Sequence, residues 1–126
     1  MISRFSHMVL DVVDVDRSLD FYAGLLGISV RMEDRWHGSR VVYLQTGETE
    51  LLLVQQSGPE LPHDRSGGLV MNFQVIDLPR LAAKVREKGV QVLQPMAGMK
   101  PGERTLLVTD PDGYAVLLSE LITPLT

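Results

Sequence analysis

The chain has 126 residues, of which 44% are hydrophobic and 22% charged, a composition typical of one globular domain. Its net charge is −4 and it has no run of lysine or arginine, which argues against a nucleic-acid or anionic-membrane partner. Cysteine is absent, which excludes disulfides and thiolate chemistry, and no apolar stretch approaches the ~20 residues that span a bilayer.

The first half of the chain predicts the element order βαβββ, which we call module one (about residues 1–56). The expected elements are a strand at 5–13, a helix at 15–26, and strands at 28–33, 40–46 and 50–55. Asp14 can cap the helix and Gly27 can end it. A loop at 34–39 and a turn at 47–48 separate the strands. Because no basic-then-apolar signal segment precedes the first strand, we expect a cytoplasmic protein.

A linker rich in glycine and proline is expected at about 57–68, and module two (about 69–126) then repeats the pattern. The expected elements are a strand at 69–75, a helix after Asp77, a short strand at 90–93, a loop at 94–102, and strands at 104–109 and 114–120. Gly89 ends the helix, and the turn 110–113 joins the last two strands.

The two modules are copies of one unit. The helix caps Asp14 and Asp77 are 63 residues apart, and the terminating Gly27 and Gly89 are 62 apart. We therefore predict an α+β fold in which two βαβββ modules form a cupped mixed sheet around a central cavity, within a single domain over 1–126. The offset that relates the modules places His7 opposite Val70, so only one copy has a side chain that can bind a metal.

The chain resembles the vicinal oxygen chelate superfamily over nearly its whole length. The matching segments are HMVLDV at 7–12 with Asp14, RSLDFY at 17–22, LLG at 25–27 and DPDGY at 110–114. The superfamily includes glyoxalases, extradiol dioxygenases, fosfomycin-resistance transferases and bleomycin-resistance binding proteins. The resemblance implies this fold, and it leaves the activity open because the fold hosts several chemistries.

The resemblance also implies a metal site with one ligand from each of four strands. His7 matches the first ligand position, Val70 the one that opens module two, and Leu117 the one in the last strand. The fourth position falls at Leu52 in one register and at Glu50 in a looser one, and both residues share a face. Since valine and leucine have no lone pair, the chain supplies too few ligands for a tight divalent site.

Several residues admit two or more interpretations. His7 can be a hydrogen-bonding group of the pocket, a structural histidine or a metal ligand, and Glu50 can be a solvated strand-end carboxylate or a cavity group. Trp36 either covers a ligand or packs on the sheet edge or a dimer contact. Asn72, inside an apolar strand, is expected to be buried and to contact a ligand or to bond across the sheet.

These observations favour a small-molecule binding protein with a degenerate metal site and no cofactor, which sequesters a small organic ligand. The ligand-binding residues that we predict are His7, Trp36, Glu50, Leu52, Val70, Asn72 and Leu117. The alternative is a lyase, isomerase or dioxygenase of the glyoxalase type, with a divalent metal at His7 and Glu50 or with none. In either case we expect a homodimer, and no nucleic-acid or membrane partner.

Overall fold

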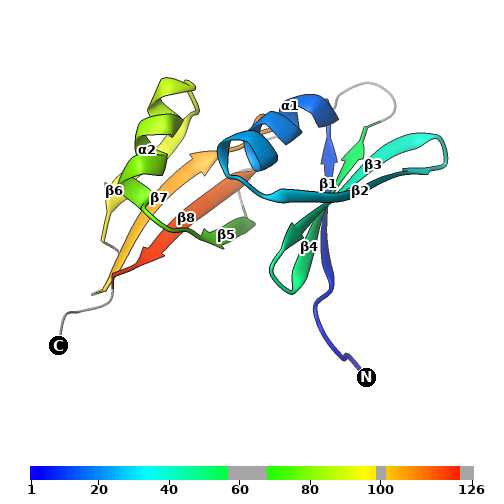
Figure 1. Cartoon of the computed structure of the whole chain (residues 1–126), viewed down its shortest axis with the longest axis horizontal. Coiled ribbons are helices and arrows are strands. Elements are labelled where there is room, and N and C mark those ends of the chain that lie inside the picture. The colour runs from blue at the N-terminus through cyan, green and yellow to red at the C-terminus, as the bar shows by residue number, and fades with distance from the viewer. Residues whose placement is uncertain (57–67, 99–101, 123–126) are drawn as a thin grey trace. The chain divides into compact units, whose positions relative to one another are not determined.

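The computed structural model describes residues 1–56, 68–98 and 102–122 (Figure 1). The chain divides into two compact units, Met1–Pro62 and His63–Thr126, and each is described by itself. Both units have the predicted order βαβββ, so the α+β class is confirmed. A cavity shared by the two modules stays a prediction. Within the described ranges, no helix has the length and apolar character needed to cross a membrane.

Unit one contains a four-stranded sheet with one helical segment against it. Its elements are β1 (His7–Val12), α1 (Val15–Leu19), the π-helix η1 (Asp20–Leu25), β2 (Ser29–Trp36), β3 (Ser39–Thr46) and β4 (Thr49–Gln55). The strand order is β1-β4-β3-β2, with β1 parallel to β4 and the other pairs antiparallel. Gln55 of β4 accepts a hydrogen bond from the Val15 amide at 2.9 Å, which fixes the start of α1 on that face of the sheet.

Unit two repeats this arrangement with different strands. Its elements are β5 (Val70–Gln74), α2 (Leu78–Glu87), β6 (Val92–Ala97), β7 (Glu103–Thr109) and β8 (Ala115–Leu121). The strand order is β5-β8-β7-β6, again with one parallel pair, β5 and β8. In Figure 1, α2 is the yellow-green helix beside β6 and β7.

Each core lies between the helix and one face of its sheet, and the apolar spacing of the sequence produces this face. The buried side chains of unit one include Leu10, Val12, Val15, Tyr22, Leu44 and Leu53. Those of unit two include Leu78, Val85, Leu106, Val108, Val116 and Leu118. Among the described residues, no helix of its own unit lies against the opposite face of either sheet.

The helix predicted at 15–26 is present, but its second half, Asp20–Leu25, is π-helical. The Ile28 amide donates to the Tyr22 carbonyl at 3.0 Å, whereas in unit two the Val90 amide donates to the Val85 carbonyl at 3.1 Å. The first bond spans one residue more than the second. A π-helical turn accommodates one inserted residue, and this insertion explains why the helix starts are 63 residues apart and the ends 62.

The predicted loop 34–39 is a tight hairpin instead. β2 continues to Trp36 and β3 begins at Ser39, so that only His37 and Gly38 form the turn. Both have positive φ, 50° and 82°, as a two-residue turn matched to the strand twist requires. Histidine adopts this conformation more readily than most residues, but it is a weak turn signal in a sequence.

The predicted loop 94–102 is also partly wrong, because β6 extends through Pro95 to Ala97. β6 is an edge strand, and its pairing with β7 is interrupted between Val92 and Gln94 and again between Gln94 and Ala97. A proline is tolerated in such a strand because an edge position does not need its amide hydrogen.

Candidate functional site

The face of the unit-one sheet that lies away from α1 carries a group of polar and aromatic side chains that contact one another. The parallel register of β1 and β4 places His7 opposite Glu50 and Val9 opposite Leu52. Because side chains alternate along a strand, these four residues point to the same face. The candidate site lies on this face of the sheet.

His7 and Glu50 form a pair across the two strands. The His7 Nε2 atom lies 3.3 Å from Glu50 Oε1, and its Nδ1 atom lies 2.9 Å from the Ser6 hydroxyl oxygen. A carboxylate can only accept, so Nε2 donates to Glu50, whereas the Ser6 hydroxyl can either donate to or accept from Nδ1. The His7 side chain is 37% exposed and that of Glu50 is 16% exposed, so the imidazole remains accessible to a ligand.

Arg31 completes the polar group, which we call the His7 cluster (His7, Arg31 and Glu50). Its Nε atom donates to Glu50 Oε2, and its Nη2 atom donates to Oε1 at 3.1 Å. Arg31 is the residue of β2 that has no partner in β3, since Val30 pairs with Leu44 and Met32 pairs with Tyr43. A bulge of this kind redirects a side chain, which brings the guanidinium over the sheet face.

Two aromatic rings adjoin the His7 cluster. The guanidinium carbon of Arg31 lies 5.1 Å from the centre of the Tyr43 ring, within the range of a cation–π contact. The Trp36 ring meets Tyr43 edge to face, with ring centres 6.2 Å apart and planes at 84°. Trp36 therefore packs on its own sheet at the edge strand β2, and it is still 38% exposed. An aromatic surface beside a polar group suits an amphipathic organic molecule.

The hydrogen bonds from Arg31 hold the pKa of Glu50 below its ordinary value, against a smaller opposing effect of burial. The charge of Arg31 and the hydrogen bond from His7 act in the same direction. Glu50 is therefore ionised at neutral pH. Both of its oxygens accept from Arg31, and Oε1 also faces His7. This carboxylate is suited to orienting His7 and Arg31, and it is poorly suited to accepting a proton from a substrate.

The matching positions in unit two carry no such group. Val70 pairs with Ala115 in the parallel register of β5 and β8, as His7 pairs with Glu50 in unit one. Val70 is half exposed. Leu117 lies opposite Asn72, which corresponds to the pairing of Leu52 with Val9. The second module thus contributes aliphatic side chains where the first has an ion pair.

Asn72 differs from the expectation of a buried amide, because it is exposed. Its Oδ1 atom accepts a hydrogen bond of 2.8 Å from the Ser119 hydroxyl, which is the bond across the sheet that the sequence left as one of two alternatives. A short edge strand explains the exposure, since β5 has only β8 beside it.

The donor set does not fit a tightly bound divalent metal. Within the described residues, no three histidine, aspartate or glutamate side chains gather closely enough to hold an ion. A catalytic metal in such a site generally needs three protein ligands. His7 and Glu50 supply two, and the Arg31 guanidinium already occupies the Glu50 carboxylate with a fixed positive charge. A cation at Glu50 has to displace this charge.

Of the seven predicted ligand-binding residues, the structure brings His7 and Glu50 into contact and places Trp36 and Leu52 on the same sheet. Leu52 is only 2% exposed. Sequence reasoning missed Arg31 and Tyr43. The alternation of Val41, Tyr43 and Gln45 along β3 could have revealed Tyr43, whereas the bulge hides Arg31 from any count of alternation. His63 and Asp64, which are adjacent in the predicted linker and were expected at the surface, and Met99, in the predicted loop 94–102, lie outside the described residues.

Comparisons with known proteins agree with this architecture. The profile of the Glyoxalase/Bleomycin resistance protein/Dioxygenase superfamily matches residues 4–118. A probable lactoylglutathione lyase of Synechocystis sp. is 29% identical over 119 residues, which cover 89% of this chain and 91% of that protein.

Solved structures of related proteins share the fold. Trypanothione-dependent glyoxalase I from Leishmania major is 28% identical with a TM-score of 0.77, over 93% of this chain and 86% of that one. The fosfomycin resistance protein FosX from Mesorhizobium loti is 22% identical with a TM-score of 0.73, over 99% and 95% of the two chains. At that identity the second likeness shows the fold alone.

The repeated βαβββ units and the profile match over most of the chain confirm the resemblance drawn from the sequence. The chain belongs to the Glyoxalase/Bleomycin resistance protein/Dioxygenase superfamily.

Proposed function

We propose that the protein is a metal-independent binding protein that sequesters a small amphipathic organic molecule in the cytoplasm. The observation that carries this proposal is the bidentate contact of Arg31 with Glu50, together with aliphatic residues at the matching positions of module two. Both oxygens of the Glu50 carboxylate, which a metal would need as a ligand, accept hydrogen bonds from Arg31. What remains accessible is a set of hydrogen-bonding groups beside two aromatic rings.

The chemistry of the His7 cluster indicates the kind of ligand. The exposed imidazole and guanidinium can each contact a polar or anionic group, while Tyr43 and Trp36 offer a flat apolar surface for an aromatic or aliphatic body. In such a site the apolar area supplies most of the affinity and the few polar groups fix the orientation. Val70, Asn72 and Leu117 of unit two stay predicted ligand contacts.

The test is a binding screen with and without EDTA, read by thermal shift and by Trp36 fluorescence. Because Trp36 is the only tryptophan, its emission reports on this surface alone. Metal-free bleomycin and small aromatic carboxylates are suitable first probes. Arg31→Gln should weaken binding at least about tenfold, the effect of one charge-assisted hydrogen bond, and the control Arg80→Gln on α2 should not. Equal affinity of the wild type and Arg31→Gln would overturn the proposal.

A second candidate function is a lyase of the glyoxalase type. The contact between His7 and Glu50 and the identity of 29% to a probable lactoylglutathione lyase favour it. The test is the formation of a thioester from methylglyoxal and glutathione, with the protein alone and with added zinc or nickel. Turnover that is abolished by His7→Ala would establish this candidate in place of the first.

A further inference from the structure

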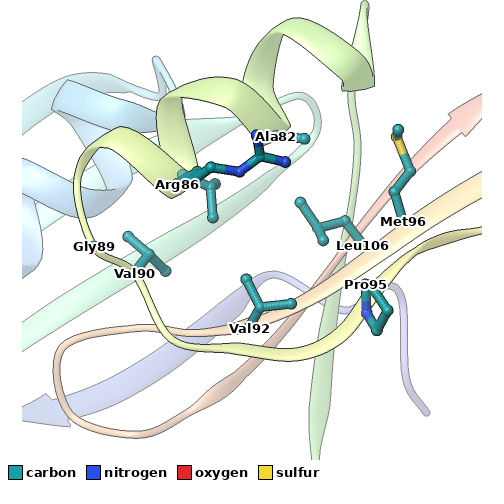
Figure 2. Close-up of a pocket in the computed structure, with 9 residues that line it drawn as sticks. Ala82, Arg86, Gly89, Val90, Val92, Pro95, Met96 and Leu106 are labelled. Atoms are coloured by element: carbon teal, nitrogen blue, oxygen red, sulfur yellow. The ribbon is translucent and has the colours of Figure 1, made fainter.

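Unit two contains a cavity that the His7 cluster does not involve. Its volume is about 310 Å³, near the lower end of the range for ligand pockets, about 300 Å³. It lies between α2 on one side and β6 and β7 on the other (Figure 2). The residues that line it include Ala82, Val85, Arg86, Val92, Met96 and Leu106. The cavity is therefore on the helix-covered side of the sheet, away from Val70, Asn72 and Leu117.

The internal repeat allows one lining residue of the cavity to be compared with its counterpart in unit one. Tyr22 and Val85 follow their helix caps Asp14 and Asp77 by the same number of residues, and their carbonyls accept the corresponding bonds at the helix ends. Tyr22 is fully buried and Val85 is 1% exposed. Unit one fills the space beneath its helix with an aromatic ring, whereas unit two has only the small side chain of valine. Val85 is one of the residues that line the cavity.

The β6 wall of the cavity is apolar and accessible. Val92 and Met96 are both 43% exposed, and Pro95 interrupts the pairing of β6 with β7 between Gln94 and Ala97. Methionine adapts its shape to irregular ligands, because its side chain is unbranched and flexible. Apolar surface that stays open to solvent in this way gains free energy when an apolar body covers it.

Arg86 is the one charged side chain in the lining. Figure 2 shows its guanidinium lying beside Ala82. Among residues 1–56, 68–98 and 102–122, no carboxylate forms an ion pair with Arg86. No acidic residue lines the cavity. A guanidinium with free donors at the edge of an apolar pocket matches a carboxylate, which it can bind through two parallel hydrogen bonds.

We infer that this cavity is a second binding site, for a small carboxylate with an aliphatic body. The body occupies the space between Val85, Val92 and Leu106, and the carboxylate pairs with Arg86. The site is independent of the proposed function, because all of its lining residues belong to unit two.

Octanoate is the probe, and octan-1-ol is its uncharged match. We expect octanoate to shift the backbone amide resonances of residues 82–96 in two-dimensional NMR spectra and to bind more tightly than octan-1-ol. Arg86→Gln should weaken octanoate binding at least about tenfold and leave octan-1-ol unaffected. Arg80→Gln removes an arginine from the same helix outside the cavity, and it should change neither affinity. Arg86 is exposed, so its replacement preserves the core.

A second variant tests the volume. Ala82→Phe extends a ring into the cavity from α2 and should abolish the binding of both probes, in a protein whose thermal unfolding shows that it is folded. The inference is overturned if octanoate shifts only amides outside unit two, or if Arg86→Gln binds octanoate as the wild type does. If Ala82→Phe does not fold, the octanoate affinity of Arg86→Gln alone tests the inference.

Discussion

Arg31 donates two hydrogen bonds to the carboxylate of Glu50 from the one position of β2 that a bulge leaves unpaired. This contact changes what Glu50 can do. In a metal-binding relative such a carboxylate would need to face a cation, whereas here it faces a guanidinium that never loses its charge. The same contact presents Arg31 and His7 to a ligand in a fixed arrangement.

Replacement of His7 should affect binding and not folding. We predict that His7→Ala weakens ligand binding by about 1–3 kcal/mol, the effect of losing one buried hydrogen bond, and that the unfolding temperature changes little because the imidazole is 37% exposed. Calorimetric titration with a ligand from the screen, together with thermal unfolding, measures both quantities. An unfolded His7→Ala protein would instead assign His7 a structural role.

The π-helical turn predicts that the protein tolerates the deletion of one residue from η1 but not from α2. Deleting Gly24 should convert η1 into a regular α-helix like α2 and leave the protein folded, because Gly24 is exposed and lies within the segment that carries the extra residue. The matched deletion of Lys84 from α2 should unfold the protein, since it rotates Val85 out of the core.

Circular dichroism and thermal unfolding of the two deletion variants check this prediction. Equal loss of structure in both would show that the extra residue of η1 is required for packing, contrary to our interpretation.

Glu120 should make unit two sensitive to acid. Burial acts to raise the pKa of this carboxylate, but hydrogen bonds from the Asp77 and Leu78 amides and from Arg104 together outweigh it, and the pKa lies below the ordinary value. A group whose pKa is lowered on folding stabilises the folded state above its ordinary pKa, about 4.3 for glutamate, and this stabilisation is lost as the pH falls below that value.

We therefore predict that the unfolding temperature falls between neutral pH and pH of about 3, and that Glu120→Gln is less stable at neutral pH and less sensitive to acid than the wild type. A matched control is Glu87→Gln at the exposed end of α2. If the unfolding temperatures of Glu120→Gln and the wild type fall equally with pH, Glu120 does not cause the sensitivity to acid.

The sequence was sufficient for some features because their causes are local. Asp14 and Asp77 accept hydrogen bonds at the helix starts as predicted, and the alternation in β4 gave the correct faces. The bulge at Arg31 was not predictable, because it depends on how β2 pairs with β3, and that pairing decides which side chains reach Glu50. The offsets of 63 and 62 residues were interpreted only as a repeat, and nothing local in the sequence shows that a π-helical turn absorbs the extra residue.

The open sheet faces predict self-association. Val9 and Val70, on the faces away from the helices, are 51% and 49% exposed. Large exposed aliphatic side chains on a sheet are costly in water, and contact with a second copy would cover them. We expect the mass of two chains by light scattering at tens of micromolar protein. The mass of one chain under those conditions would contradict the prediction.

The most direct test of metal independence is elemental analysis of the protein purified from medium supplemented with zinc, nickel, iron and manganese, alongside ligand binding before and after treatment with EDTA. Our account predicts well under one tightly held ion per chain and the same affinity in both conditions, because Arg31 occupies the Glu50 carboxylate. About one ion per chain, with binding lost after EDTA treatment, would contradict it.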